Sequence, residues 1–309
     1  MGKTATRDAY GKALAQLGAE NEQVVVLDAD LSGSTKTAAF AQEFPRRFFN
    51  LGIAEADLIG TAAGLAAAGK IPFASTFAVF AAGRAYDQIR ASAAYPNLNV
   101  KIAATHAGLT VGEDGATHQM NEDIALMRAL PNMTVVVPAD GPEAAAATHA
   151  VARHQGPVYL RLGRPAVPDI HGEDYDFELF KAPALKEGGD VAIFACGYMV
   201  HLALEAAAQL EKQGISAAVV NVHTIKPLDK ETILAYARRC RRVITAEEHS
   251  IIGGLGSAIA EVLGEEEPTP MARIGVRDTF GESGKPAELL AKYGLTAEAI
   301  VQAAKKLME

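Results

Sequence analysis

A single loop concentrates the side chains of this sequence that are able to carry out chemistry. Residues 105–119 directly follow the apolar run 100–104 and contain two imidazoles and two carboxylates among glycines: His106, Glu113, Asp114 and His118. In open α/β sheets, strands that end in Gly-rich loops are usual places for binding sites, because glycine lets the backbone approach a ligand. Imidazoles and carboxylates bind hydroxyls and move protons near neutral pH. The pattern predicts an active-site loop; the alternative is a surface loop whose histidines cap turns.

Two further positions can face a ligand above the same strand ends. Glu55 follows the apolar run 48–54 and opens a helix rich in alanine and glycine, where unpaired backbone donors and the helix dipole stabilise a carboxylate. Alone, such a glutamate is more often a helix cap. Phe77 and Phe80 are three residues apart and can offer a flat wall to an aromatic ring, although core packing is the default for that spacing.

Groups able to bind an anion also stand at predicted element ends. Asp30, Ser32 and Ser34 follow the apolar run 24–27, where hydroxyls and backbone N–H groups can bind an anion or cap a helix. Isolated guanidiniums suit a phosphate as well as surface ion pairs, and three stand near strand or helix ends: Arg7, Arg161 and Arg164.

Strand-length apolar runs alternate with helical patterns, which indicates a largely parallel sheet covered by helices on both faces. In the first part of the chain we predict strands at 24–27, 48–51, 72–76, 100–104, 134–137 and 158–160. The predicted helices there are 6–19, 55–68, 79–94, 119–129 and 141–154.

A second α/β series begins near residue 190. Its predicted strands are 191–195, 217–222, 243–246 and 271–276, and its predicted helices are 199–213, 229–238, 254–263 and 286–308. Between the two series, proline, glycine and acidic residues predict a linker over the surface. The predicted fold class is therefore α/β with two doubly wound domains, 1–165 and 190–309, joined by the linker 166–189.

Composition limits the function classes. The chain has 309 residues, 49% hydrophobic and 21% charged, and this length fits about two globular domains. A net charge of -8 without a long basic run argues against nucleic acid as a partner and favours a small molecule. Cys196 and Cys240 lack metal-ligand spacing and are interpreted as buried or idle thiols. Without a signal-peptide pattern or an apolar run of ~18 residues, we expect a cytoplasmic protein with no membrane segment.

Two segments look like sites but predict none. Residues 253–257, Gly-Gly-Leu-Gly-Ser, open a predicted helix but lack the Gly-x-Gly-x-x-Gly spacing and the Walker lysine, so they indicate close helix–strand packing. Glu247, Glu248 and His249 are consecutive on a predicted strand, so their side chains alternate between faces and cannot readily converge on a metal. We predict no metal site in this chain.

Five segments in the same order resemble the C-terminal half of transketolase, the thiamine diphosphate enzyme that moves a two-carbon ketol unit between sugar phosphates. The most specific is 105–119, with its Gly-Glu-Asp-Gly-x-Thr-His sequence, and the resemblance spans essentially the whole chain. The supporting segments are 5–7 (Ala-Thr-Arg), 30–34 (Asp-Leu-Ser-Gly-Ser), 50–55 (Asn-Leu-Gly-Ile-Ala-Glu) and 75–80 (Ser-Thr-Phe-Ala-Val-Phe). The two predicted domains would then be the pyrimidine-binding domain and the transketolase C-terminal domain.

The resemblance implies which residues bind the cofactor. Glu55 matches the glutamate that hydrogen-bonds to N1′ of the aminopyrimidine, and Phe77 and Phe80 match the aromatic wall beside that ring. Asp30 matches an acid near the thiazolium. Gly83 stands where a third aromatic residue often follows in transketolases, so the resemblance implies a more open pocket.

It also implies which residues bind the substrate. His106 and His118 match histidines that bind hydroxyls and phosphate, and Asp114 matches an acid that reads the ketose stereochemistry. The residues matched to the terminal phosphate are Arg7, Ser34 and Arg161. The implied catalytic set is Glu55, His106, Asp114 and His118.

One part of the family site is missing from the sequence. Transketolases hold the diphosphate through Mg²⁺ on a Gly-Asp-Gly motif, and this chain contains no Gly-Asp-Gly. The resemblance therefore implies an N-terminal partner subunit that carries Mg²⁺ and the diphosphate contacts, in an α2β2 assembly acting on sugar phosphates in the pentose phosphate pathway.

Three alternatives remain open. The β subunit of a 2-oxo acid dehydrogenase E1 component has this length and domain order, but it lacks the Gly-Glu-Asp-Gly-x-Thr-His loop and the phosphate-binding groups. Deoxyxylulose phosphate synthase has a related loop but is normally a longer chain. A non-catalytic relative could keep the fold without the activity, although retention of Glu55, His106, Asp114 and His118 argues against it.

Overall fold

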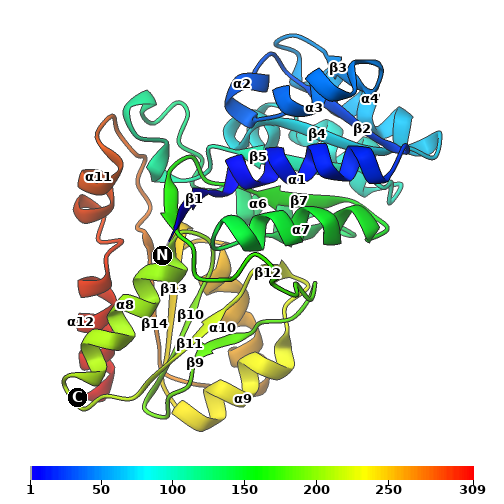
Figure 1. Ribbon diagram of the computed structural model, residues 1–309. Coiled ribbons are helices and arrows are strands. Elements are labelled where there is room, and N and C mark those ends of the chain that lie inside the picture. The colour runs from blue at the N-terminus through cyan, green and yellow to red at the C-terminus, as the bar shows by residue number, and fades with distance from the viewer. Residues whose placement is uncertain (1) are drawn as a thin grey trace.

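Two lobes, each built on its own mostly parallel sheet, form the computed structural model, which describes residues 2–309 (Figure 1). The first sheet has seven strands in the order β12-β6-β7-β5-β4-β2-β3, and only β12–β6 is antiparallel. The strands are β2 (Val24–Asp28), β3 (Phe48–Asn50), β4 (Ile71–Phe77), β5 (Lys101–Thr105), β6 (Thr134–Val136), β7 (Val158–Arg161) and β12 (Thr224–Lys226). This confirms the predicted α/β class.

Alternation along the strands divides the first lobe into two cores. On β2, Val24 and Val26 pack with Tyr10, whereas Val25 and Leu27 pack on the opposite face, because successive strand residues point to opposite sides. The first face is covered by α1 (Thr6–Glu20), α3 (Ala38–Glu43) and α7 (Gly141–Arg153), and α1 and α7 lie side by side (Figure 1). The second is covered by α4 (Glu55–Ala67), α6 (Asp123–Ala129) and the helical segment 79–94.

The second lobe repeats this layering around a five-stranded sheet, with the order β14-β13-β10-β11-β9. Its strands are β9 (Ala184–Lys186), β10 (Val191–Ala195), β11 (Ala217–Asn221), β13 (Val243–Ser250) and β14 (Met271–Val276), all parallel apart from β9. Helices α8 (Met199–Glu211) and α12 (Ala297–Met308) cover one face, and α9 (Lys230–Cys240) and α10 (Leu255–Glu266) cover the other.

The two lobes share hydrophobic packing. One continuous cluster contains Leu27 and Ile102 of the first sheet, Phe194 and Val220 of the second, and Ile225 of β12. Strand β12 comes late in the chain but pairs with β6 of the first sheet, so the second lobe supplies one edge of the first. The segment 166–189, predicted as a linker, contains β9 and also β8 (Ala166–Pro168), which pairs with β1 (Lys3–Ala5).

Helix boundaries differ from the prediction at three places. The predicted helix 79–94 is divided into η2 (Val79–Arg84), α5 (Tyr86–Gln88) and η3 (Ile89–Ala94), and the two outer parts are π-helical. Helix α6 begins at Asp123 rather than 119, because Met120 is engaged with the active-site loop, where its carbonyl accepts from the Gly108 N–H. The tail forms two helices, α11 (Pro286–Lys292) and α12, separated at Gly294, which has a left-handed φ of +71°.

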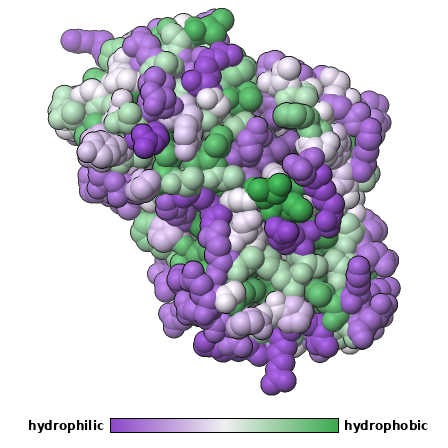
Figure 2. All heavy atoms as spheres, turned by 180° about the vertical axis from the view of Figure 1, so that it is seen from behind, coloured by the Kyte–Doolittle hydropathy of each residue, from purple (hydrophilic) through white to green (hydrophobic). Residues whose placement is uncertain are grey.

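Seen from behind, hydrophilic and hydrophobic residues are mixed over both lobes (Figure 2). Within residues 2–309, no helix combines the length and the hydrophobicity needed to cross a bilayer. The two cysteines, Cys196 and Cys240, are both free and buried.

Candidate active site

The site residues gather at one edge of the first sheet. Strands β2, β4 and β5 are parallel neighbours, so their carboxyl ends meet at the same edge. Phe77 ends β4, Thr105 ends β5, and Asp30 follows β2 by two residues. The loop after β5 continues as the 3₁₀ helix η4 (Leu109–Asp114), which is kinked at Gly112.

His106 lies at the centre of this edge and is 3% exposed. Its Nε2 is 3.0 Å from Nη1 of Arg7, and its Nδ1 is 2.9 Å from Oγ1 of Thr105. A guanidinium can only donate, so Nε2 accepts from Arg7 and Nδ1 carries the proton. Burial, and next the positive charges of Arg7 and Arg164, lower the pKa of His106 to about 3. The imidazole is therefore neutral at physiological pH.

Both histidines pack with Phe77 and Phe80, the two residues predicted to form an aromatic wall. Phe77 and Phe80 lie parallel with ring centroids 5.8 Å apart, and His106 stacks on Phe77 at 3.8 Å. His118, which is half-buried, meets the Phe80 ring edge-on at 5.6 Å. At Gly83, which is exposed, an added Cβ would find no atom within 4 Å, so a side chain would fit at this position.

Glu55 is the first residue of α4 and is only 2% exposed. Its two carboxylate oxygens each lie 2.9 Å from Nη1 of Arg84, whose guanidinium also stands 4.6 Å above the Phe80 ring. The sequence reasoning did not single out Arg84. Its position at the end of the π-helical η2 is set by the tertiary structure rather than by a motif.

Arg7 connects this wall to the loop after β2. Its Nη1 donates to the backbone oxygen of Ser34 at 3.1 Å, and its buried Nε has no hydrogen-bond partner. An unpaired buried donor beside a polar opening fits a ligand that brings an acceptor. Asp30 is exposed and has a left-handed φ of +62°. Its Oδ1 accepts a hydrogen bond from Nδ2 of Asn50 at 3.4 Å. Asp114 is exposed on the active-site loop.

Arg161 does not belong to this group, which corrects the sequence-based assignment. It is 6% exposed, and its Nε donates to Oδ2 of Asp123 at 2.8 Å, while Nη2 donates to the carbonyl oxygen of Glu248 at 3.0 Å. The guanidinium thus lies in the junction between the lobes. Arg161 and Tyr159 lie on the same face of β7, because residues two apart on a strand point the same way. The Tyr159 hydroxyl donates to the same carboxylate oxygen of Asp123.

Arg164 takes its place beside Arg7. The Thr6 hydroxyl accepts from the Gly163 N–H at 2.8 Å, which ties the segment after β7 to the start of α1. Arg164 is 35% exposed, contacts the Val111 carbonyl oxygen, and lies 3.4 Å from the Glu113 carboxylate. Its charge lowers the pKa of Arg7 and His106, although burial is the larger cause in both. In the sequence, Arg164 differs from Arg161 in lying beyond the end of β7, where side chains no longer alternate between the two faces of the sheet.

The second lobe holds the active-site loop through Glu248 of β13. Its Oε1 accepts from the Thr110 N–H at 2.6 Å and would lie 2.3 Å from a Cβ at Gly108, where φ is +80°. Only glycine fits at position 108. Burial raises the pKa of Glu248 to about 7. The sequence reasoning considered Glu248 only as a metal ligand.

The neighbouring Glu247 explains the Gly-rich turn that looks like a nucleotide-binding motif. Its carboxylate accepts from the N–H groups of Leu255 and Gly256, at 2.7 and 2.8 Å, and so caps α10. Across residues 2–309, no group of three or more histidine, cysteine or acidic side chains is arranged to hold a metal ion.

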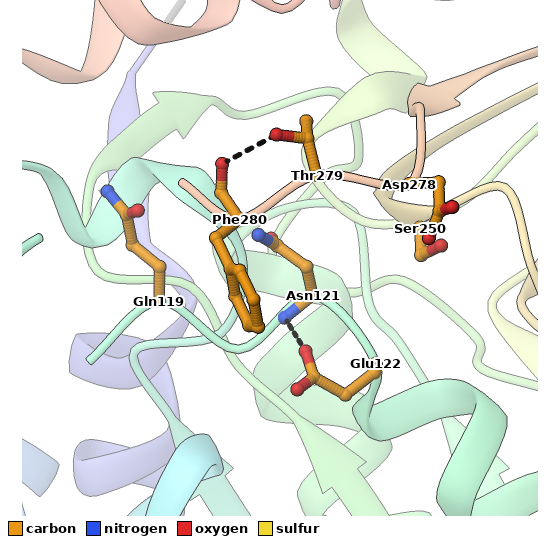
Figure 3. Close-up of a pocket in the computed structure, with 7 residues that line it drawn as sticks. All are labelled: Gln119, Asn121, Glu122, Ser250, Asp278, Thr279 and Phe280. Atoms are coloured by element: carbon orange, nitrogen blue, oxygen red, sulfur yellow. Dashed lines mark hydrogen bonds between the residues drawn. The ribbon is translucent and has the colours of Figure 1, made fainter. Parts of the chain in front are cut away.

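A cavity of about 230 Å³ is lined in part by Gln119, the residue that follows His118 in the chain (Figure 3). The residues that line it come from both lobes: Gln119, Asn121, Glu122, Ser250, Asp278, Thr279 and Phe280. Gln119 donates to the carbonyl oxygens of Leu109 and Gly112, so it supports the loop. None of the predicted site residues lines this cavity.

The fold and the site together define a two-lobed α/β protein whose sheet edge presents stacked aromatic rings, a buried carboxylate and guanidinium groups. Two family models match the chain: the pyrimidine-binding domain of transketolase over residues 2–169, and the transketolase C-terminal domain over residues 180–300. The chain belongs to the transketolase family and corresponds to its C-terminal half. The pyrimidine-binding domain implies thiamine diphosphate as the cofactor.

Relatives and solved structures agree with this family. A putative transketolase C-terminal section of Methanocaldococcus jannaschii is 52% identical, over 98% of this chain and 95% of the relative. A 6-deoxy-6-sulfo-D-fructose transketolase subunit of a Clostridium species is 48% identical, over 98% and 94%. A solved structure described as a split gene transketolase, an inactive beta4 tetramer, is 59% identical with a TM-score of 0.93, covering 98% of both chains. The 2-oxo acid dehydrogenase alternative is not favoured.

Proposed function

We propose that this chain is the C-terminal subunit of a two-chain transketolase, which transfers a two-carbon ketol unit from a ketose phosphate to an aldose phosphate. The observation that carries the proposal is the aromatic wall of Phe77 and Phe80, with the buried Glu55 on one side and His106 and Arg7 on the other. A flat ring and an anionic sugar would meet at this edge.

The residues fit the aminopyrimidine of thiamine diphosphate. Phe77 and Phe80 offer apolar ring faces, and Glu55 presents a buried carboxylate. When bound, this cofactor supplies the stabilised carbanion chemistry that a ketol transfer requires. Glu55 would accept a hydrogen bond from the ring nitrogen N1′ and hold the proton there. We keep Asp30 as a proposed contact near the thiazolium.

The substrate would lie between the wall and the loop after β5. His106, His118 and Asp114 are the proposed partners of the substrate hydroxyls. Two guanidiniums, Arg7 and Arg164, suit a terminal dianion. Ser34 is the proposed hydroxyl donor to that anion, and Arg161 is left out of the binding set.

A partner subunit would supply what this chain lacks. We propose an N-terminal transketolase chain that carries Mg²⁺ and the diphosphate contacts, in a cytoplasmic α2β2 enzyme of the pentose phosphate pathway. Within this chain we propose a pyrimidine-binding unit, 1–165, and a C-terminal unit, 190–309, joined by 166–189. The solved split gene transketolase that is an inactive beta4 tetramer supports the need for a second chain.

The test is a coupled assay of xylulose 5-phosphate plus ribose 5-phosphate with thiamine diphosphate and Mg²⁺, using the chain alone and mixed with the candidate N-terminal partner. We expect turnover only in the mixture. Glu55→Gln should reduce kcat by at least about 100-fold, because the proton on N1′ loses its acceptor, while the variant should still form the complex. Normal turnover by the chain alone would exclude the two-chain proposal, and an inactive complex would exclude this reaction.

The sulfonated sugar named for one relative is a second candidate donor. Arg7 and Arg164 recognise a terminal anion by charge, and a sulfonate presents the same three oxygens as a phosphate with less negative charge. Comparing kcat/KM for fructose 6-phosphate and 6-deoxy-6-sulfofructose in the active mixture separates the two. A preference for the sulfonate would replace the sugar phosphate in this proposal.

A further inference from the structure

Arg84 contacts both groups that the proposed function assigns to the aminopyrimidine. Its Nη1 is 2.9 Å from Oε1 and 2.9 Å from Oε2 of Glu55. Its guanidinium carbon lies 4.6 Å from the centroid of the Phe80 ring, which is cation–π distance. One side chain therefore binds the carboxylate and covers the aromatic ring at the same time.

A guanidinium and an aminopyrimidine satisfy such a pocket in the same way. Both are flat, both stack on an aromatic face, and both present N–H donors, so each can meet Phe80 and Glu55 together. An aminopyrimidine that stacks on the Phe80 face covered by Arg84 and bonds to the Glu55 oxygens held by Arg84 would have to displace it.

We propose that Arg84 is a built-in competitor of the cofactor, which fills the aminopyrimidine site of the unpartnered chain and turns outward when thiamine diphosphate binds. The inference rests on the proposed function, because that function assigns Glu55 and Phe80 to the cofactor. Arg84 is thereby a specificity-determining and regulatory residue outside the set matched to the family motifs.

Burial explains why the chain needs such a group. Glu55 is 2% exposed, and a buried carboxylate without a partner is strongly destabilising, so a cation must compensate it until the cofactor brings its own hydrogen-bonding ring. Arg84 provides this compensation from the end of η2.

Exposure explains how Arg84 can leave. Its side chain is 52% exposed, so the guanidinium is already partly hydrated and loses little when it moves into water. An arginine that is half-exposed and binds a fully enclosed acid is suited to reversible release.

The competition lowers the apparent affinity for the cofactor ring. When a side chain occupies a binding site for part of the time, the apparent Kd of a ligand for that site is raised. It equals the intrinsic Kd divided by the fraction of time that the site is free. Because Arg84 is 52% exposed but its partner Glu55 is only 2% exposed, we expect a factor of at least about five. Removing the arginine should recover that factor.

The experiment uses the full chain and 4-amino-5-hydroxymethyl-2-methylpyrimidine, which carries the aminopyrimidine without the diphosphate. Ligand-observed NMR titrations would compare the dissociation constants of the wild type and Arg84→Ala. Arg90→Ala is the matched control, because Arg90 is exposed in the following π-helical turn. Arg84→Gln, which keeps most of the side chain, replaces the alanine variant if that variant does not fold.

We expect Arg84→Ala to bind the pyrimidine at least about fivefold more tightly than the wild type, and Arg90→Ala to bind it equally. In the complex with the partner, Arg84→Ala should also lower the Kd for thiamine diphosphate. Equal or weaker pyrimidine binding by Arg84→Ala would overturn the proposal, since it would make Arg84 a bystander or a direct cofactor ligand. Because the titration measures no turnover, an inactive mixture with tighter pyrimidine binding would reject the proposed reaction and keep this inference.

Discussion

Arg161 and Arg164 are only three residues apart in the sequence, but one has a structural role and we propose a binding role for the other. Arg161 is the last residue of β7, so the strand alternation sends its side chain into the junction between the lobes, onto Asp123. Arg164 follows the strand end and is held beside Arg7 by the hydrogen bond between Thr6 and Gly163. The same side-chain chemistry therefore serves stability at one position and, as we propose, phosphate binding at the other.

Two alanine variants test this division. Arg164→Ala should raise the KM for a phosphorylated donor by about 10- to 100-fold, because it removes charge-assisted hydrogen bonds worth about 1.5–3 kcal/mol, while thermal stability stays near the wild type. Arg161→Ala should lower the free energy of unfolding by about 3–5 kcal/mol, because it leaves the buried Asp123 unpaired. Steady-state kinetics and chemical denaturation of both variants measure the two effects. The opposite pattern would restore Arg161 to the binding set.

At the scale of elements, the active-site loop depends on a strand of the other lobe. Glu248 of β13 accepts from the Thr110 N–H, and Gly108 lets the loop pass close to that carboxylate. The loop that carries His106 and Asp114 is thus fixed by a residue 138 positions away along the chain from Thr110. Loop geometry and the packing of the lobes are coupled by this contact.

The buried Glu248 also predicts a pH dependence of stability. Its pKa is raised by burial from 4.5 to about 7, so the folded chain holds a proton that the unfolded chain has released. This contribution is fully present below about pH 4.5 and is lost as the pH rises through about 7. Because glutamine resembles the protonated acid, the Tm of the wild type should therefore fall relative to that of Glu248→Gln from pH 5 to pH 8.

Thermal unfolding followed by circular dichroism at four pH values in that range measures the effect. Glu288→Gln is a suitable control, since Glu288 is an exposed residue of α11. A difference between the wild type and Glu248→Gln that stays constant across this range would contradict the assigned pKa.

At the scale of the whole molecule, an exposed apolar side chain lies close in the sequence to Glu55, the proposed catalytic residue. Ile53 is 77% exposed and precedes Glu55 by two residues, and Phe49 of β3 is 39% exposed. The adjoining face of α4 carries Gly60 and Gly64, where an added Cβ would meet no atom within 4 Å. Small residues on an exposed helix face allow another backbone to approach closely. This surface suits a neighbouring subunit.

Ile53→Asp tests that surface. A buried charge at a subunit interface is costly, so the variant should weaken association with the N-terminal partner by at least about tenfold. The Tm of the chain alone should not change, because Ile53 is exposed there. Analytical ultracentrifugation of the mixture measures association, and Ile252→Asp, at another exposed isoleucine, is the control. Unchanged association of Ile53→Asp would remove Ile53 from the interface.

The sequence by itself determined the elements whose patterns are strong and local. The helices α1, α4 and α7 and the strand β10 lie within one or two residues of their predicted bounds, because apolar period, caps and glycine act over a few neighbours. The π-helical breaks in 79–94 and the late start of α6 were missed, since contacts from distant segments outweigh local propensity there. The domain bounds and most site roles stay predictions.

The tertiary structure decided which of the candidate side chains meet. Strand order brings Arg7 to His106 across 99 positions of the chain, and sends Arg161 to Asp123 and Glu248 instead of to the proposed phosphate site. It also places Arg84 on Glu55, a contact without a sequence signature. Spacing in a sequence specifies which face of an element a residue occupies, whereas the partner on that face depends on how elements far apart in the chain pack together.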